Sequence, residues 1–594
     1  MAVLSWIWSI LKSLLNSIAR AVVFVLILVG VLVGIGVSVG DGLPGNMVLE
    51  LDLRKALSDK SAPQLLDFGR PSLSVMDIVL ALDAAAIDPR VKGIFMRVGS
   101  GDLSIPKAEE LRDSLKQFKT RGKFVIAHAQ SFYSSGLGDY EVAAASDQIW
   151  MQPVSTFFST GEAGSTLFYK GLFDKLDAVP QFVQRYEYKN AANVFTETDF
   201  TPAHREATTR VLQSWYDSAT AEAAADRKID KAALIGALDA SPIQVEEVKA
   251  RNLITDIGYD EDARNAARQK AGQGAAVTSF DRYAQAIRNR LGFANTNAPA
   301  LALVHAAGDI VEGGDDGPLA KGGVIITGDT YAQAIREAAA DRAVRAIVLR
   351  VDSPGGSAIA SDQILDAVKK AQAAGKPVVV SMGSVAASGG YFIALSANRI
   401  VAEPGTLTGS IGVLWGKVAI GKTAEKAGLE ARELGVGKNA LFLSGVTPWS
   451  PDQLEQVNAQ ADAVYADFTG KVAEGRKLSL DRVQQVARGR VWTGADAKER
   501  GLVDELGGFW TAVADAKALA NIAADTRVTF KNYPTRQGLF GALSRLLDDS
   551  SASVTVLQGL NALLQAEPIR TLMAAVQAMP DGKAQLIATG LPAH

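Results

Sequence analysis

The chain has 594 residues, which is too long for a single hydrophobic core, so two or more domains are expected. Charged residues make up 21% of the composition and the net charge is −3, which gives no reason to expect a nucleic-acid partner. The absence of cysteine excludes disulfides, thiolate metal sites and a cysteine nucleophile, and it leaves the redox compartment open.

An apolar segment without charge runs from residue 21 to residue 40. At 1.5 Å per residue, about 20 residues span a hydrocarbon core of about 30 Å. Lys12 and Arg20 precede the segment and Asp41 follows it, so the positive-inside tendency places residues 1–20 in the cytoplasm. A cleaved signal peptide is the alternative, but the run is longer than a usual signal core and no good A-x-A site follows. We therefore expect an uncleaved transmembrane anchor at 21–40, preceded by an amphipathic cytoplasmic segment.

The rest of the chain repeats itself at a slowly drifting offset. Arg97 matches Arg350 at an offset of 253, and Lys189 matches Lys438 at an offset of 249, with other matches in the same order between them. Ordered matches of this kind indicate an internal duplication. We predict two copies of one domain, a first repeat at 46–290 and a second repeat at 298–530.

Short apolar runs alternate with amphipathic stretches in each repeat, which predicts an α/β fold with a largely parallel sheet. In the second repeat the pattern predicts, in order, a strand, a loop, a helix, a strand, a turn and a helix that starts at Ser388: Ala346–Val351, Asp352–Ser357, Ser361–Ala374, Pro377–Met382 and Gly383–Ala387. The tail at 540–594 contains two apolar amphipathic helices, for which we expect a packing or assembly role.

Ser388 lies in the sequence Ala-Ala-Ser-Gly-Gly-Tyr, where small residues allow a substrate backbone to approach closely. If a helix begins here, the amide of Gly389 points toward a developing oxyanion. Gly356, at the end of the preceding strand, could supply a second amide, because loops at neighbouring strand ends gather at one edge of a parallel sheet. Tight helix–sheet packing explains the same glycines equally well.

A serine nucleophile needs a base. The four histidines, His128, His204, His305 and His594, stand in no motif with a partner carboxylate, so a histidine triad has weak support. A lysine can serve if burial lowers its pKa from about 10.4 toward 7–8. No P-loop or ligand cluster is present in the sequence, so no metal or nucleotide cofactor is expected.

Four motifs of the second repeat, in this order, resemble the signal peptide peptidase A (protease IV) family in its long, tandem-repeat form. They are Leu349–Ser357, Ala386–Tyr391, Thr406–Gly412 and Val491–Ala497. The resemblance covers nearly the whole chain after the anchor. It implies two Clp-protease/crotonase-like domains, no cofactor, and a bacterial inner-membrane protein whose catalytic domains lie in the periplasm.

The resemblance also implies a serine–lysine dyad, with Ser388 as nucleophile and Lys189, from the first repeat, as base. Lys438 is an alternative base, because its spacing from Ser388 fits single-domain relatives, in which both groups belong to one type of chain. The hydroxyl of Ser410 could orient the lysine amine. The first repeat offers Ser135, but two extra residues follow it and the upstream loop lacks the S-P-G-G turn, so we interpret this second site as degenerate.

The hypothesis from the sequence is a membrane-anchored serine endopeptidase that degrades cleaved signal peptides and other short or unfolded peptides. The alternatives are a crotonase-like acyl-CoA enzyme and a non-catalytic membrane scaffold. Because the proposed base lies in the other repeat, contact between repeats must build the site. Two quasi-equivalent domains with heterologous contacts tend to close into rings, so we expect a homotetramer or another closed homo-oligomer.

Overall fold

The computed structural model describes residues 41–60, 73–99, 103–134, 136–291, 298–314 and 324–534. The expected cytoplasmic segment, the anchor at 21–40 and the tail at 540–594 lie outside these ranges. Among the described residues, no helix combines the length and the apolar character that crossing a membrane requires. Both repeats belong to one compact unit.

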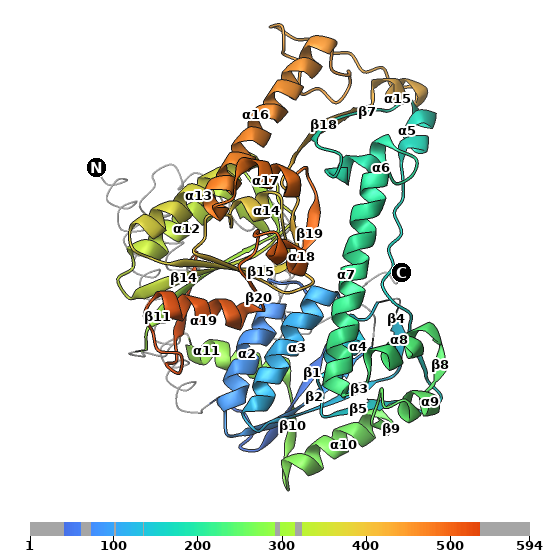
Figure 1. Cartoon of the computed structure of the whole chain (residues 1–594), viewed down its shortest axis with the longest axis vertical. Helices are drawn as coiled ribbons and strands as arrows, with labels where there is room; N and C mark the ends of the chain where they lie inside the picture. Colours follow the sequence, from blue (N-terminus) through green and yellow to red (C-terminus); the bar gives the residue numbers. More distant parts are fainter. Residues whose placement is uncertain are drawn as a thin grey trace, which may run out of the picture. The chain divides into compact units, whose positions relative to one another are not determined.

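The first repeat forms a six-stranded parallel sheet in the order β10-β1-β2-β3-β5-β9 (Figure 1). Its strands are β1 (Met47–Asp52), β2 (Val91–Val98), β3 (Phe124–Ala129), β5 (Gln148–Met151), β9 (Asp256–Ile257) and β10 (Ala276–Ser279). The helix α10 (Asp260–Ala271) covers one face, where Ala263 and Ala267 are buried against Phe95 and Ile126. The other face is covered by α2 (Val75–Ile87), α3 (Ile105–Thr120), α4 (Gly138–Ala144) and α11 (Phe280–Leu291).

The second repeat forms an eight-stranded sheet, in which every pairing is parallel except that of β17 with β19. Its strands are β11 (Ala300–Ala307), β14 (Val344–Ser353), β15 (Val378–Ala387), β16 (Arg399–Ala402), β17 (Leu407–Gly409), β19 (Val491–Thr493), β20 (Glu505–Leu506) and β21 (Thr529–Tyr533). The helices α12 (Gly328–Ala340) and α13 (Ala358–Ala373) cover one face, and α19 (Phe509–Leu519) covers the other. The expectation of largely parallel α/β sheets is confirmed.

Further strands and helices lie outside the two large sheets. The small strands are β4 (Phe132–Ser134), β6 (Thr156–Ser159) and β8 (Ile243–Gln244) in one sheet, and β12 (Asp309–Val311) and β13 (Ile325–Thr327) in another. The remaining helices are α5 (Lys170–Leu176), η1 (Asn190–Ala192), α6 (Asn193–Thr196), α7 (Pro202–Arg227), α8 (Lys231–Asp239), α9 (Val245–Ala250), α14 (Gly389–Phe392), α15 (Gly421–Lys426), α16 (Pro451–Arg476), α17 (Leu480–Val486) and α18 (Gly494–Glu499).

The two repeats stack with unlike faces in contact. Phe509 of α19, Leu111 of α3 and Val348 of β14 belong to one continuous cluster of buried apolar residues. The helix α19 of the second repeat therefore packs toward α2 and α3 of the first (Figure 1). The helix α10 is the counterpart of α19, and α12 and α13 are the counterparts of α2 and α3. The α10 face of the first repeat and the α12–α13 face of the second repeat therefore remain outside this junction.

A second connection between the repeats is made by strands. β7 (Val179–Arg185) of the first repeat pairs antiparallel with β18 (Val413–Ala419) of the second, from Arg185 opposite Val413 to Val179 opposite Ala419. The pairing is visible beside α16 in Figure 1. Because the partners are more than 200 residues apart, the hydrophobic pattern of the sequence does not reveal this pairing.

The expected turn at Gly383–Ala387 is wrong, because β15 continues without interruption to Ala387. The strand pairs with β16 over Val379–Ser381 and then with β17 over Val385–Ala387. Between these pairings the register with β14 shifts, and the amide of Val385 donates to Asp352 Oδ1 at 3.0 Å. Gly383 fits this irregularity, since a Cβ there would lie 2.9 Å from Asp352 Cβ.

Candidate active site

Ser388 stands directly after β15, at the start of the short helix α14. Its backbone has φ 53° and ψ −117°, a region that residues with a side chain rarely occupy. Its amide donates to Gly409 O at 2.9 Å, and its carbonyl accepts from Phe392 N at 2.9 Å. A Cβ at Gly389 would lie 2.7 Å from Ser361 Oγ, so the sharp turn that presents Ser388 requires the glycine that follows.

Gly356 and Gly389 present their backbones to one another beside this serine. Gly356 forms a parallel bridge with Ile310, in which Ile310 N donates to Gly355 O and Ser357 N donates to Ile310 O, both at 2.8 Å. In such a bridge the amide of Gly356 itself points to the opposite side. That nitrogen lies 3.1 Å from the position of a Cβ built on Gly389. The backbones of the two glycines therefore lie close together beside Ser388.

Lys189 reaches the same place from the first repeat, four residues after the end of β7. The β7–β18 pairing fixes this approach, and Tyr186 N donates to Arg488 O at 3.2 Å. Lys189 passes so close to Gly489 that a Cβ on this glycine would lie 2.4 Å from Lys189 Cβ. Gly489 also has φ +80°, so both its backbone conformation and the lack of room for a Cβ require glycine at this position.

The amine of Lys189 has three oxygen partners. Nζ lies 3.0 Å from Ser388 Oγ, 2.9 Å from Ser410 Oγ and 3.0 Å from Ser410 O. A neutral amine has two N–H donors and one lone pair. The carbonyl of Ser410 can only accept and its hydroxyl is free to do so, which leaves the lone pair for the hydroxyl proton of Ser388.

Burial favours this neutral form. The Lys189 side chain is almost entirely enclosed, and desolvation lowers the pKa of its amine from the usual 10.5 to about 8. The amine is thus within reach of a serine hydroxyl and titrates near neutral pH, which are the two properties that a general base requires.

Comparisons with known proteins show the family to which the chain belongs. The model of peptidase family S49 matches residues 117–274 and 370–523. The chain belongs to peptidase family S49. A chloroplastic serine protease SPPA of Arabidopsis thaliana is 31% identical over 81% of this chain and 70% of its own length. A Protease 4 of Salmonella typhi is 32% identical over 83% of this chain and 79% of its own length. The chain is accordingly a serine peptidase.

Solved structures add little to the identification of this S49 peptidase. A ClpP1 mutant from Listeria monocytogenes is 15% identical and covers 36% of this chain and 94% of its own, with a TM-score of 0.22. A TM-score this low does not show a shared fold. The Clp-protease/crotonase-like assignment therefore stays a prediction from the sequence resemblance.

Lys438, the alternative base, lies elsewhere in the S49 peptidase. Its side chain is 78% exposed, and its Nζ is 3.6 Å from Asp452 Oδ2. The amine within hydrogen-bonding distance of Ser388 Oγ is that of Lys189. Ser135 lies outside the described residues, so its expected degeneracy stays a prediction.

The histidines do not form a triad with Ser388 among the described residues. His305 does have a partner carboxylate that the sequence did not indicate, because its Nε2 lies 2.6 Å from Asp59 Oδ2. Asp59 also accepts from Arg350 at 2.7 Å, and the same guanidinium donates to Glu110 at 2.7 Å. This buried network joins the first repeat to the sheet of the second, so it supports the junction that brings Lys189 to Ser388.

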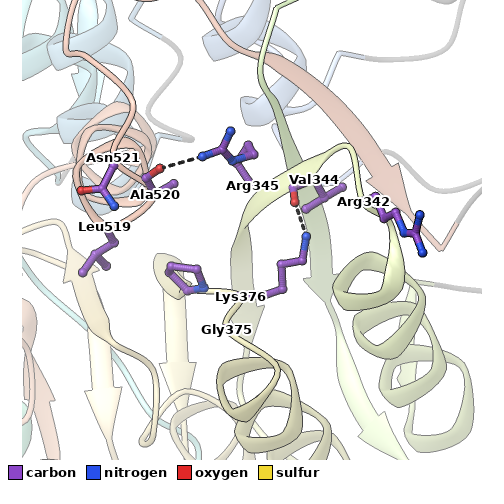
Figure 2. A pocket seen from close by; sticks show the side chains of 9 residues that line it. Arg342, Val344, Arg345, Gly375, Lys376, Leu519, Ala520 and Asn521 are labelled. Atoms are coloured by element: carbon purple, nitrogen blue, oxygen red, sulfur yellow. Dashed lines mark hydrogen bonds between the residues drawn. The ribbon is translucent and has the colours of Figure 1, made fainter.

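One cavity of this S49 peptidase lies away from Ser388. Figure 2 shows a cavity of about 420 Å³ at the amino ends of β14 and β15, the opposite end of β15 from Ser388. Its basic side chains are partly committed to the backbone, with Lys376 donating to Val344 O and Arg345 to Ala520 O. This cavity is therefore separate from the contact between Ser388 and Lys189.

Proposed function

We propose that this S49 peptidase hydrolyses peptide bonds through a dyad of Ser388 and Lys189. The observation that carries the proposal is the 3.0 Å approach of a buried lysine amine to Ser388 Oγ, in a place where the backbones of Gly356 and Gly389 lie close to one another. The mechanism starts from the neutral amine, whose lone pair is available to the hydroxyl proton of Ser388.

In the first step, Lys189 takes the proton as Ser388 Oγ attacks the substrate carbonyl. The amides of Gly356 and Gly389 stabilise the negative charge that develops on the carbonyl oxygen. The protonated amine then gives its proton to the leaving nitrogen, and the peptide bond breaks to leave an acyl–serine. In the second half, the neutral amine takes a proton from water, which attacks the acyl group, and the proton returns to Ser388.

Ser410 has a positioning part in this proposal. It offers a hydroxyl and a carbonyl oxygen to the amine, at 2.9 and 3.0 Å. These two contacts fix both N–H groups of the neutral amine and aim its lone pair at Ser388. The φ of 50° at Ser410 allows both oxygens to face the same amine.

For substrates, we propose cleaved signal peptides and other short or unfolded peptides at the periplasmic face of a bacterial inner membrane. The support is the resemblance to the signal peptide peptidase A family and the uncharged run at 21–40 after Lys12 and Arg20. Protease added to spheroplasts is expected to digest the catalytic domains. Digestion that occurs only after lysis would contradict the periplasmic orientation.

We also propose a closed homo-oligomer built from the strand pairing that joins the repeats. By the offsets of the duplication, residues 428–434 of the second repeat correspond to β7, and residues 162–168 of the first repeat correspond to β18. Within one chain, Leu434 is 99% and Leu167 is 74% exposed, and Val436 is fully exposed. If residues 428–434 of one protomer pair with 162–168 of the next, these apolar side chains are covered and Lys438 is carried toward the first repeat of the neighbour.

A serine-reactive fluorophosphonate tests the dyad. The wild type is expected to be labelled and to cleave casein, while Ser388→Ala and Lys189→Ala lose both reactions. Lys438→Ala and Ser135→Ala serve as matched controls and are expected to keep most activity. An acyl-CoA enzyme or a scaffold would not depend on Ser388 for labelling. Loss of activity in Lys438→Ala together with an active Lys189→Ala would overturn the assignment of the base.

A further inference from the structure

Three buried or half-buried carboxylates converge at the junction between the repeats. They are Glu109 on α3, Glu141 on α4 and Glu222 on α7, and one oxygen of each lies within 4.8 Å of the others. Glu141 is fully buried and Glu109 is 1% exposed. Burying several like charges together is unfavourable unless protons or a cation compensate them.

Glu141 is the least compensated of the three. Within the described part of the chain, neither carboxylate oxygen of Glu141 accepts from an N–H or hydroxyl donor, and its polar neighbour is the carboxyl of Glu222. Glu109 is different, because it accepts from Gly405 N at 2.7 Å and from Ser218 Oγ at 2.8 Å. The side chain of Glu141 is therefore directed at two other acids while lacking a donor of its own.

The second repeat provides an internal comparison for this cluster. The helices α3 and α13 correspond over their whole length, as do α7 and α16. Tyr140 and Tyr391 correspond as well, since their hydroxyls donate to Leu253 O at 3.0 Å and to Leu502 O at 2.9 Å. The positions equivalent to the three glutamates are accordingly Asp362, Phe392 and Lys471.

In the second repeat a cation stands among these positions. Lys471 Nζ lies 2.6 Å from Asp362 Oδ1 and 5.3 Å from the centre of the Phe392 ring. In the first repeat the equivalent of this lysine is Glu222 and the equivalent of the phenylalanine is Glu141. On equivalent helices, the first repeat thus has carboxylates where the second repeat has a partly exposed ammonium and a phenyl ring.

Arg112 is the cationic side chain that approaches the first-repeat cluster, and it is divided among several acids. Its Nη1 is 2.6 Å from Glu222 and its Nε is 2.5 Å from Asp226. One guanidinium therefore leaves negative charge uncompensated when the carboxylates are ionised.

We propose that Glu109, Glu141 and Glu222 bind a divalent cation of the hard, oxygen-preferring class, such as Ca²⁺. The three oxygens lie within 4.8 Å of one another, so small side-chain shifts bring them to the distance of about 2.4 Å that a Ca²⁺–oxygen bond requires. Glu222 is 25% exposed and gives the ion a path from solvent. Because Glu109 also binds Gly405 of the second repeat, the ion would stabilise the junction on which the approach of Lys189 to Ser388 depends.

Equilibrium binding of Ca²⁺ to the full-length chain tests this site, after the protein has been stripped with a chelator. Calorimetry is expected to show one saturable equivalent per chain, with Mg²⁺ and Mn²⁺ titrated in parallel, and the thermal midpoint is expected to rise by a few degrees at saturation. Glu141→Gln, which keeps the shape and removes one charge, is expected to weaken binding by at least roughly tenfold. Glu455→Gln, an exposed position on α16, is the matched control.

A second variant copies the arrangement of the second repeat. The double substitution Glu141→Phe with Glu222→Lys is expected to abolish Ca²⁺ binding and to make the thermal midpoint independent of chelator, while casein cleavage persists. The proposal is overturned if the stripped wild type takes up none of the three ions at 1 mM. It is also overturned if Glu141→Gln binds as tightly as the wild type. Neither result would bear on the Ser388–Lys189 dyad, which the fluorophosphonate assay tests separately.

Discussion

The titration of Lys189 makes a quantitative prediction about the pH dependence of the reaction. A buried amine with a pKa of about 8 is neutral in about one-tenth of molecules at pH 7, in about half at pH 8 and in about nine-tenths at pH 9. The rate of fluorophosphonate labelling of Ser388 is therefore expected to rise about tenfold from pH 7 to pH 9 and then to level off. An amine with the ordinary pKa of about 10.4 would give a rate that is still rising tenfold per unit at pH 9.

Lys189→Arg is the decisive companion variant. It retains a positive charge at the same place, but a guanidinium does not deprotonate in this range, so alkaline pH is not expected to restore labelling. The assay is stopped-time labelling of the purified full-length chain between pH 6 and pH 10, with unfolding monitored in the same buffers. A rate that is flat across this range, or a Lys189→Arg variant that regains wild-type labelling at pH 9, would refute the assignment of Lys189 as base.

Three further predictions follow from the same geometry. Gly489→Ala places a Cβ 2.4 Å from Lys189 Cβ and is expected to reduce kcat/KM by about 100-fold, whereas Gly428→Ala, at a similar φ of +76° with nothing within 4 Å, should cost about 1 kcal/mol of stability and keep activity. The lowered pKa of Lys189 means that the unfolded chain holds a proton that the folded chain has lost between pH 8 and pH 10.5, so the free energy of unfolding of the wild type should rise by about 3 kcal/mol relative to Lys189→Met as pH increases from 7 to 10.5. Denaturant titrations that run parallel for the two proteins would contradict this. Leu434→Asp is expected to shift the sedimenting species toward the monomer while Ser388 is still labelled; an unchanged oligomer would exclude the proposed strand pairing between protomers.

The sequence was informative wherever a local pattern decides the structure. Short β-branched runs predicted the strands, and their alternation with amphipathic stretches predicted parallel sheets, because both signals lie within about twenty residues. The sequence also predicted a helix that starts at Ser388, and the short helix α14 does begin at the next residue. The same reasoning failed at Gly383, since a glycine that indicates a turn in isolation here occupies an irregularity between two strand pairings.

Contacts between residues far apart in the chain could not be predicted from the sequence. The β7–β18 pairing, the His305–Asp59 contact and the approach of Glu109 to Glu141 and Glu222 all join separate parts of the fold. Lys189 could be named as a candidate from the family resemblance, but its hydrogen bonds to Ser410 and its burial depend on the docked repeats. Physical reasoning from one sequence offers no signal for such pairs, since each residue alone is ordinary at its position.

The placement of Ser388 and Lys189 on one chain has a consequence for genetics. When two subunits share a site, two different inactive variants can complement each other in a mixed oligomer, because some sites receive one intact residue from each. In the proposed dyad both residues come from the same polypeptide, since Lys189 Nζ lies 3.0 Å from Ser388 Oγ within one chain. Co-expression of Ser388→Ala and Lys189→Ala chains is therefore not expected to restore peptidase activity. An inactive allele is expected to lower the activity in proportion to its share of the chains, without inactivating the wild-type subunits beside it.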